Sequence, residues 1–188
     1  MRRLSIVFTV LAAAIFAASG KAEDPAGRSA ELQVLDHFLG TWDHEVTITR
    51  FNEIGQRVAT KTTDVDTRQW SAGGTFLIIE NSLGMKKDPD VSEFIMMITY
   101  DPETHTYPGC FMSGSSRAFL TGTWNERTQT MHWRGRDLDE NKRMGKHRFI
   151  GRDRAEASLV ITNPASTKTA DPFGRLKIEL SWKQTRRK

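Results

Sequence analysis

Residues 39–49, LGTWDHEVTIT, decide the fold of this chain. The stretch follows a short segment of helical periodicity, and the period changes to two at Trp42. From there one face carries Trp42, His44, Val46 and Ile48, and polar residues alternate with them, which predicts a half-buried β-strand. A tryptophan at the head of such a strand suggests a β-barrel that is closed at its base.

A short helix is predicted immediately before this strand, over residues 30–39. Ser29 is a suitable N-cap, and Glu31 places negative charge in the first turn, where a helix favours it. Gly40 provides the stop signal. One apolar face is formed at helical spacing by Leu32, Leu35 and Phe38.

The rest of the chain is predicted to consist of short strands joined by tight turns. Residues 57–70 are polar and Thr-rich, which predicts a long exposed strand. Further strands are expected at about 75–83, 93–100, 107–113, 118–124, 129–135, 146–152, 156–162 and 176–183. Residues 136–145 are interpreted as a charged loop. About ten strands with short connections favour an all-β, up-and-down antiparallel barrel, with residues 29–188 as a single domain.

The N-terminus has the features of a secretory signal peptide, predicted over residues 1–22. Arg2 and Arg3 precede an apolar stretch that ends near Ala18, and small residues follow it. That stretch of about 15 residues is shorter than the roughly 20 that span a bilayer, so we expect cleavage rather than a stable membrane anchor. The sequence therefore predicts export to the periplasm or the extracellular space, with residues 23–28 as a mobile leader.

Charge and cysteine content limit the partners that the protein is expected to have. Export would remove three of the 27 basic residues and none of the 23 acidic ones, leaving 24 against 23 and a net charge of +1. Nucleic-acid binding usually needs a basic face, so we expect no nucleic-acid partner. The single cysteine, Cys110, excludes an intrachain disulfide and is interpreted as a small core residue. Nothing in the sequence sets the oligomeric state.

Several short motifs, in a fixed order, resemble a known family. They are Leu39-Gly40-Thr41-Trp42, Gly73-Gly74-Thr75-Phe76-Leu77, Tyr100-Asp101-Pro102, Tyr107-Pro108-Gly109, Gly122-Thr123-Trp124 and residues 182–188. The first resembles the start of lipocalins and fatty-acid-binding proteins, together the calycins. The set as a whole is similar to the bacterial domain of unknown function 1579 family, which implies a lipocalin-like barrel without a settled activity.

The resemblance implies a structural role for the residues that close the barrel, Gly40, Trp42 and a late arginine. In calycins the tryptophan plugs the base, often beneath an arginine near the end of the chain. Arg186 is the candidate for that arginine, through a cation–π contact with the indole. Arg187 is the alternative, since one residue reverses the face of a strand, and a frayed basic tail is the third interpretation.

No catalytic or metal-binding motif is present in the sequence. Zinc-protease, P-loop, dinucleotide-binding and nucleophile-elbow patterns are absent, so we predict no metal and no cofactor. His44 is interpreted either as a core histidine that is hydrogen-bonded to a neighbour, which we favour, or as a polar group for ligand binding. Glu80 is interpreted similarly, because it shares the expected inward face of Phe76 and Ile78, near the end of its strand.

The leading hypothesis is a non-enzymatic barrel that binds a small apolar or amphipathic molecule in its interior. A mostly apolar cavity with a few polar groups is typical of such sites. The alternative is an enzyme or a haem protein that uses an inward histidine, although no histidine follows His147. A third hypothesis, a protein-interaction module, depends on the charged loops 84–91 and 136–145. The candidate cavity residues are Trp42, His44, Val46, Ile78, Glu80, Phe94, Met96 and Ile98.

Overall fold

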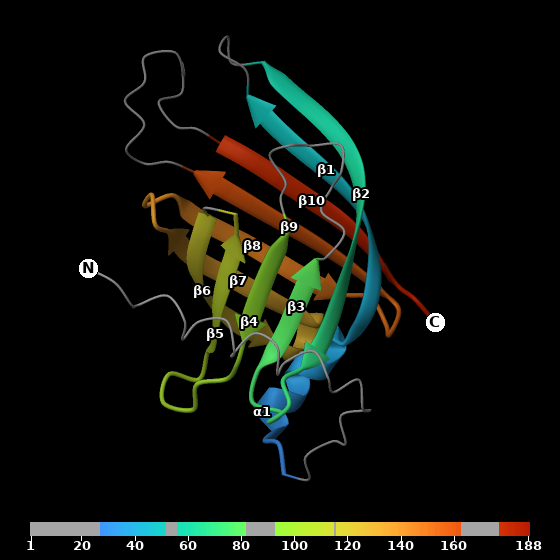
Figure 1. Cartoon of the computed structure of the whole chain (residues 1–188), viewed down its shortest axis with the longest axis vertical. Helices are drawn as coiled ribbons and strands as arrows, with labels where there is room; N and C mark the ends of the chain where they lie inside the picture. The colour runs from blue at the N-terminus through green and yellow to red at the C-terminus, as the bar shows by residue number, and fades with distance from the viewer. Residues whose placement is uncertain (1–26, 52–55, 82–92, 115, 163–176) are drawn as a thin grey trace, which may run out of the picture.

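Ten antiparallel strands close into a barrel in the computed structural model, which describes residues 27–51, 56–81, 93–114, 116–162 and 177–188 (Figure 1). Each strand pairs with its neighbour in sequence, and β1 pairs with β10 to complete the ring. The predicted all-β, up-and-down barrel of about ten strands is thereby confirmed. The predicted signal peptide lies outside the described residues.

Most strand bounds follow the predicted pattern, and the strand expected at 146–152 differs most. The elements are α1 (Ala30–Gln33), η1 (Val34–Phe38), β1 (Gly40–Phe51), β2 (Arg57–Trp70), β3 (Leu77–Asn81), β4 (Phe94–Ile98), β5 (Tyr107–Ser113), β6 (Ser116–Asn125), η2 (Glu126–Thr128), β7 (Thr130–Asp137), β8 (Lys142–Phe149), β9 (Arg154–Thr162) and β10 (Lys177–Arg186).

The short N-terminal helix lies at one end of the barrel, which we call the base (Figure 1). The Ser29 side chain accepts a hydrogen bond from the Leu32 amide at 3.3 Å, as an N-cap does. One α-helical turn then tightens into the 3₁₀-helix η1. Gly40 follows with a φ of +106°, a conformation that favours glycine, and the chain turns there into β1.

The predicted loop 136–145 is wrong, because most of it belongs to two strands. β7 continues to Asp137 and β8 begins at Lys142, so only a short turn separates them. Asp137 accepts hydrogen bonds from the Asn141 amide at 2.9 Å and from the Arg143 guanidinium at 3.1 Å. Because Asp137 and Arg143 are both buried, these charges satisfy each other inside the barrel, which a pattern that places charges outside does not detect.

A compact aromatic and aliphatic core fills the barrel at its base. Trp42, Phe38 and Leu35 are almost fully buried there, and the Trp42 indole donates a hydrogen bond to the Phe38 carbonyl at 2.7 Å. This bond ties the first strand to η1. Gly122 makes room for the Trp133 indole, since a Cβ at that position would lie 2.7 Å from the ring. The base is therefore closed by packing.

The opposite part of the interior, which we call the distal half, is packed less completely. Strand register places Leu180 of β10 opposite Ile48 of β1 and Leu159 of β9, so all three face inward. Ile48 is buried, whereas Leu159 and Leu180 are only half-buried. Other inward apolar residues that are half-buried are Phe94, Met96, Phe111, Ile178 and Trp182.

Candidate functional site

Five polar side chains meet inside the barrel, directly above the core at the base. We call them the inner network: His44, Asp66, Arg68, His147 and Gln184. All five side chains are buried. Strand register brings them together, because His44 on β1 pairs with Gln184 on β10, and Asp66 on β2 pairs with Trp42.

Hydrogen bonds connect four of these side chains in a chain. The Arg68 guanidinium donates two bonds to the Asp66 carboxylate, at 2.8 and 3.0 Å. His44 Nε2 lies 3.2 Å from the same carboxylate, and His44 Nδ1 lies 3.2 Å from the Gln184 side-chain nitrogen. Both ring nitrogens of His44 are therefore engaged, Nε2 with Asp66 and Nδ1 with Gln184.

Two neighbouring carboxylates in β2 are shifted in opposite directions. Burial acts to raise the pKa of Asp66, but the Arg68 charge and the bonds from His44 and Arg68 outweigh it, so the pKa of Asp66 is lowered. Burial raises the pKa of Asp64, and the bonds from the Val65 amide and the Asn81 side chain offset only part of that effect. The arginine next to Asp66 accounts for the difference.

His147 is the fifth member and is also buried. Its ring stacks on Phe149 with centroids 4.7 Å apart and contacts Phe38 at 4.8 Å. Burial lowers the pKa of His147 well below its ordinary value, and the positive charge of Arg68 adds to the effect. His147 is therefore neutral at pH 7.

Three polar atoms of the inner network have no hydrogen-bond partner within the part of the chain that the structure describes. They are Arg68 Nη1, His147 Nε2 and Gln184 Oε1, and all three are closed off from solvent. A buried polar group without a partner costs about 1–3 kcal/mol. The inner network, which forms the floor of the barrel interior above the base, thus holds polar atoms without a hydrogen-bond partner.

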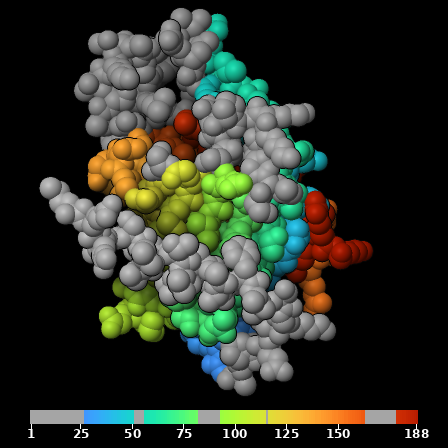
Figure 2. Space-filling model, in the orientation of Figure 1, coloured from blue at the N-terminus to red at the C-terminus, as the bar shows by residue number. Residues whose placement is uncertain are grey.

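Two guanidinium groups lie over the Trp42 indole. The Arg186 guanidinium carbon is 4.7 Å from the ring centroid, and that of Arg68 is 5.0 Å away. Arg186 also donates to the His37 carbonyl at 2.8 Å. Its neighbour Arg187 points to the other face and binds Asp43 at the surface, where the C-terminal residues lie beside β1 (Figure 2).

The candidate cavity residues divide into four groups. Trp42, His44 and Val46 are buried and face inward, whereas Phe94 and Met96 face inward and are half-buried. Ile98 is buried in the core at the base. The remaining two candidates, Ile78 and Glu80, are half-buried on the opposite face of β3 from the buried residues Leu77, Ile79 and Asn81.

The expected inward orientation of Ile78 and Glu80 is thus not what the structure shows. It placed Phe76 on the inward face, but Phe76 precedes β3 and its side chain is 44% exposed. Ile79 pairs with Arg68 and with Met96, so the inward set begins one residue later. A shift of one residue reverses every side chain of a strand.

Sequence reasoning missed Asp66 and Arg68, which are central to the inner network. Residues 57–70 were expected to form an exposed strand, because charged residues are rarely buried. A usable signal was present, since Asp64, Asp66 and Arg68 recur with period two on one face of that strand. Gln184 and the inward direction of His147 were missed as well.

The described residues contain neither a metal-binding cluster nor a membrane-spanning helix. No group of three or more histidine, cysteine, aspartate or glutamate side chains there is arranged to hold a metal ion. No helix in the same ranges is long and apolar enough to cross a membrane.

Solved structures with a similar fold exist at low sequence identity. The S-type phycobiliprotein lyase CPES from Guillardia theta superposes with a TM-score of 0.55 and 11% identity, covering 86% of this chain and 94% of the lyase. A protein of the DUF3598 family from Nostoc punctiforme gives a TM-score of 0.46 and 12% identity over 91% of this chain and 53% of its own. At 11% identity, the likeness to the lyase shows the fold alone.

The family comparison is more specific than the structural one. No curated protein matches the sequence at the stringency applied. Residues 28–169, which form most of the described barrel, match the family described as protein of unknown function (DUF1579). The chain therefore belongs to the DUF1579 family, and its fold is a lipocalin-like ten-stranded barrel.

Proposed function

We propose that this protein binds a small apolar or amphipathic molecule inside its barrel and has no catalytic role. The observation that carries the proposal is the combination of two features in one interior. The floor holds buried polar atoms without partners, and the distal half has apolar side chains that remain partly accessible. A mostly apolar wall with a few polar groups is the usual composition of a small-molecule site.

The wall would supply most of the affinity. Leu159, Ile178 and Leu180 lie in one patch on neighbouring strands, face inward and are half-buried. Covering such surface with an apolar ligand contributes about 25 cal/mol for each Å² removed from water. Trp182 continues the patch along β10, and Phe111 faces the interior from β5.

The floor would orient the ligand. Arg68 Nη1 is a donor that needs an acceptor, which a carboxylate or carbonyl oxygen of the ligand supplies. This atom is closed off from solvent, so the polar end of the ligand reaches it only with a side-chain shift in the floor. His44, the polar group expected from the sequence, already uses both ring nitrogens within the inner network.

The structural comparison adds limited support. The Guillardia theta protein is named a phycobiliprotein lyase. A protein with this fold therefore acts on another molecule. At 11% identity, neither its substrate nor its reaction is carried over to this chain.

The test uses native mass spectrometry together with a matched pair of substitutions. We expect protein purified without detergent to carry a stoichiometric small molecule, and the emptied protein to bind 1-anilinonaphthalene-8-sulfonate with saturation. Leu180→Trp, which fills the inward side of β10, should weaken dye binding at least about tenfold. Ser181→Trp adds the same ring to the exposed face one residue away and should leave binding unchanged. Equal binding by both variants, or no bound molecule and no saturation, contradicts the proposal.

The alternative function, an enzyme or haem protein, has one favourable feature. His44 and Asp66 form an imidazole–carboxylate pair at 3.2 Å, which is the arrangement of a general base. No serine, threonine or cysteine among the described residues is hydrogen-bonded to that imidazole. The pair therefore lacks a nucleophile to activate.

Haem does not fit the residues around either histidine. Both nitrogens of His44 are engaged, and His147 Nε2 is fully buried with its ring against Phe38 and Phe149. We expect haem added to the protein and to His147→Ala to give the same Soret band. A shift that disappears in His147→Ala would favour the alternative.

We also propose that the protein is exported, on the strength of the N-terminal sequence pattern. Cleavage after Ala22 would leave Glu23 as the first residue. Intact-mass measurement of protein from the periplasm and the medium should find that N-terminus. Recovery of the chain only in the cytoplasm, with residues 1–22 still attached, contradicts export.

A further inference from the structure

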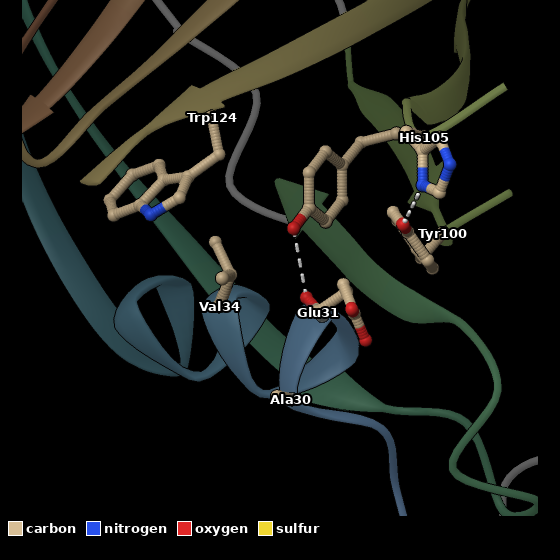
Figure 3. A pocket seen from close by; sticks show the side chains of 7 residues that line it. Ala30, Glu31, Val34, Tyr100, His105 and Trp124 are labelled. Carbon is tan, nitrogen blue, oxygen red and sulfur yellow. Dashed lines mark hydrogen bonds between the residues drawn. The ribbon is translucent and has the colours of Figure 1, made fainter. Parts of the chain in front are cut away.

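A hollow lies outside the barrel, between the helix and the turn that joins β4 to β5 (Figure 3). Its volume is about 300 Å³, at the lower end of the range for small-molecule sites. Its floor comes from α1 and η1, and its sides come from β5, β6 and the turn. The residues that line it are Ala30, Glu31, Val34, Tyr100, His105, Tyr107 and Trp124.

Aromatic rings form most of the wall of this hollow. The rings of Tyr100 and Tyr107 have centroids 5.2 Å apart and are inclined by 52°. Trp124 lies across from Tyr100, with Val34 between them (Figure 3). Three aromatic residues thus line the hollow, and the negatively polarised face of an aromatic ring attracts an organic cation.

The rings are held in place by hydrogen bonds. Tyr107 donates to the Glu31 carbonyl at 3.0 Å, which ties β5 to α1. The Tyr100 hydroxyl lies 3.0 Å from His105 Nδ1, and Trp124 donates to the Glu126 carboxylate at 2.6 Å. The hollow is therefore preformed, which reduces the entropy lost on binding.

Carboxylates give the hollow a negative potential. Burial raises the pKa of Tyr107 to about 12, and the charges of Glu31 and Glu126 add to the effect. Both carboxylates therefore act on the ring at the back of the site. The lining residues include no lysine or arginine, and His105 is the single titratable base among them. His37, which stacks on Trp124, lies behind it.

We propose that this hollow binds a quaternary ammonium group, free or as a lipid headgroup. Such a cation gains contact with the π faces of Tyr100 and Trp124 and attraction from Glu31 and Glu126, without needing a hydrogen-bond acceptor. An anion would meet two carboxylates, and a neutral apolar group would leave the negative potential unused.

The experiment compares choline with 3,3-dimethylbutan-1-ol, which has the same shape without the charge. Titration of the full protein, followed by tryptophan fluorescence and by ligand NMR, should show saturable choline binding. The uncharged alcohol should bind at least about tenfold more weakly, because the cation–π term is lost. Equal binding of the two compounds, or no saturable binding of choline, overturns the proposal.

Two variants assign the binding to this hollow. Glu31→Gln removes a charge at an exposed position and keeps the side-chain shape, so choline affinity should fall about two- to fivefold and depend less on salt. Trp124→Leu should reduce it about five- to tenfold or more. Phe119→Leu, an exposed aromatic residue on the same strand, is the control and should have no effect. Unchanged affinity in both Glu31→Gln and Trp124→Leu contradicts the assignment.

The source of the cation is distinguished in the same experiment. Choline and phosphatidylcholine vesicles are compared, with phosphatidylglycerol vesicles as the control lipid. Binding of free choline alone indicates a small metabolite, and binding of phosphatidylcholine alone, lost in Trp124→Leu, indicates a lipid headgroup. Leu180→Trp should leave choline binding intact, so failure of the barrel site and failure of this site are separable.

Discussion

Two arginine–aspartate ion pairs lie against opposite faces of β1, in opposite environments. On the outer face Arg187 binds Asp43 at 2.6 Å, with side chains that are 51% and 49% exposed. On the inner face the Asp66–Arg68 pair lies against Trp42 and His44, with side chains that are 3% and 2% exposed. The contacts are alike in geometry, so any difference in their effect arises from burial.

Physical chemistry predicts a large difference between the two pairs. An exposed pair is screened by water and stabilises a fold by about 0–1 kcal/mol. A buried pair costs free energy to desolvate, but removing one partner leaves an unpaired charge and destabilises by about 3–5 kcal/mol. The inner pair is therefore hard to break but is not necessarily a source of net stability.

The largest effect is expected for Arg68→Ala. The change leaves the Asp66 carboxylate buried beside His44 without its main partner, and it also removes a cation from the Trp42 ring. We expect the free energy of unfolding to fall by about 3–5 kcal/mol. Urea denaturation followed by tryptophan fluorescence measures it.

A double substitution sharpens this prediction. Asp66→Asn with Arg68→Met removes both charges and keeps most of the volume, so it should recover part of the loss seen in Arg68→Ala. If the double variant is less stable than Arg68→Ala, the cost of an unpaired buried charge does not explain the loss in Arg68→Ala.

The second largest effect is a pH dependence that arises from His147. Its pKa in the folded protein is well below the ordinary value of 6.5, so below pH 6.5 the unfolded chain takes up a proton that the folded chain does not. The contribution to stability is full above pH 6.5 and is lost as the pH falls toward the folded pKa. The slope reaches about 1.4 kcal/mol for each pH unit.

Chemical denaturation at several pH values between 5 and 7.5 checks this slope. His147→Gln removes the titrating group and should flatten it, while a smaller slope of the same sign remains from His37, whose pKa is also lowered by burial. His132→Gln, at an exposed site on the neighbouring strand, is the control. An unchanged slope in His147→Gln would mean that another group is responsible.

The same inner–outer comparison explains which features could be read from the sequence. Period-two patterns are local, so the strands 57–70 and 107–113 were predicted with the bounds that the structure shows. The inward direction of Trp42 and His44 came from the same kind of pattern. The turn after Asp137 was misplaced because charged residues occupy both faces of β7 and β8 there.

The inner network needed information that a local pattern does not hold. Asp66 and Arg68 are tolerated inside because His44, 22 residues before Asp66, and Gln184, near the end of the chain, lie beside them after the ring closes. Burial of a charge depends on such partners, and the partners are set by strand register over the whole barrel. Identity of residue and spacing alone favour an exposed strand.

A smaller effect is expected at Arg186, whose side chain is less buried than Arg68 and more buried than Arg187. Arg186→Met keeps the aliphatic stem over Trp42 but removes the guanidinium and its bond to the His37 carbonyl. We expect a loss of about 0.5–2 kcal/mol, the range of a partly desolvated cation–π contact. Thermal and urea unfolding should agree on it, and a loss near that of Arg68→Ala would show that Arg186 acts through more than the indole.

The smallest effect is expected at Arg187, one residue further along the chain. Arg187→Met removes three hydrogen bonds to Asp43, more than Arg186→Met removes, yet both partners are about half exposed. Water replaces those bonds, so the loss should be about 0–1 kcal/mol and should shrink further in high salt. A loss larger than that of Arg186→Met, or one that is insensitive to salt, would show that the number of contacts rather than burial sets the strength of these pairs.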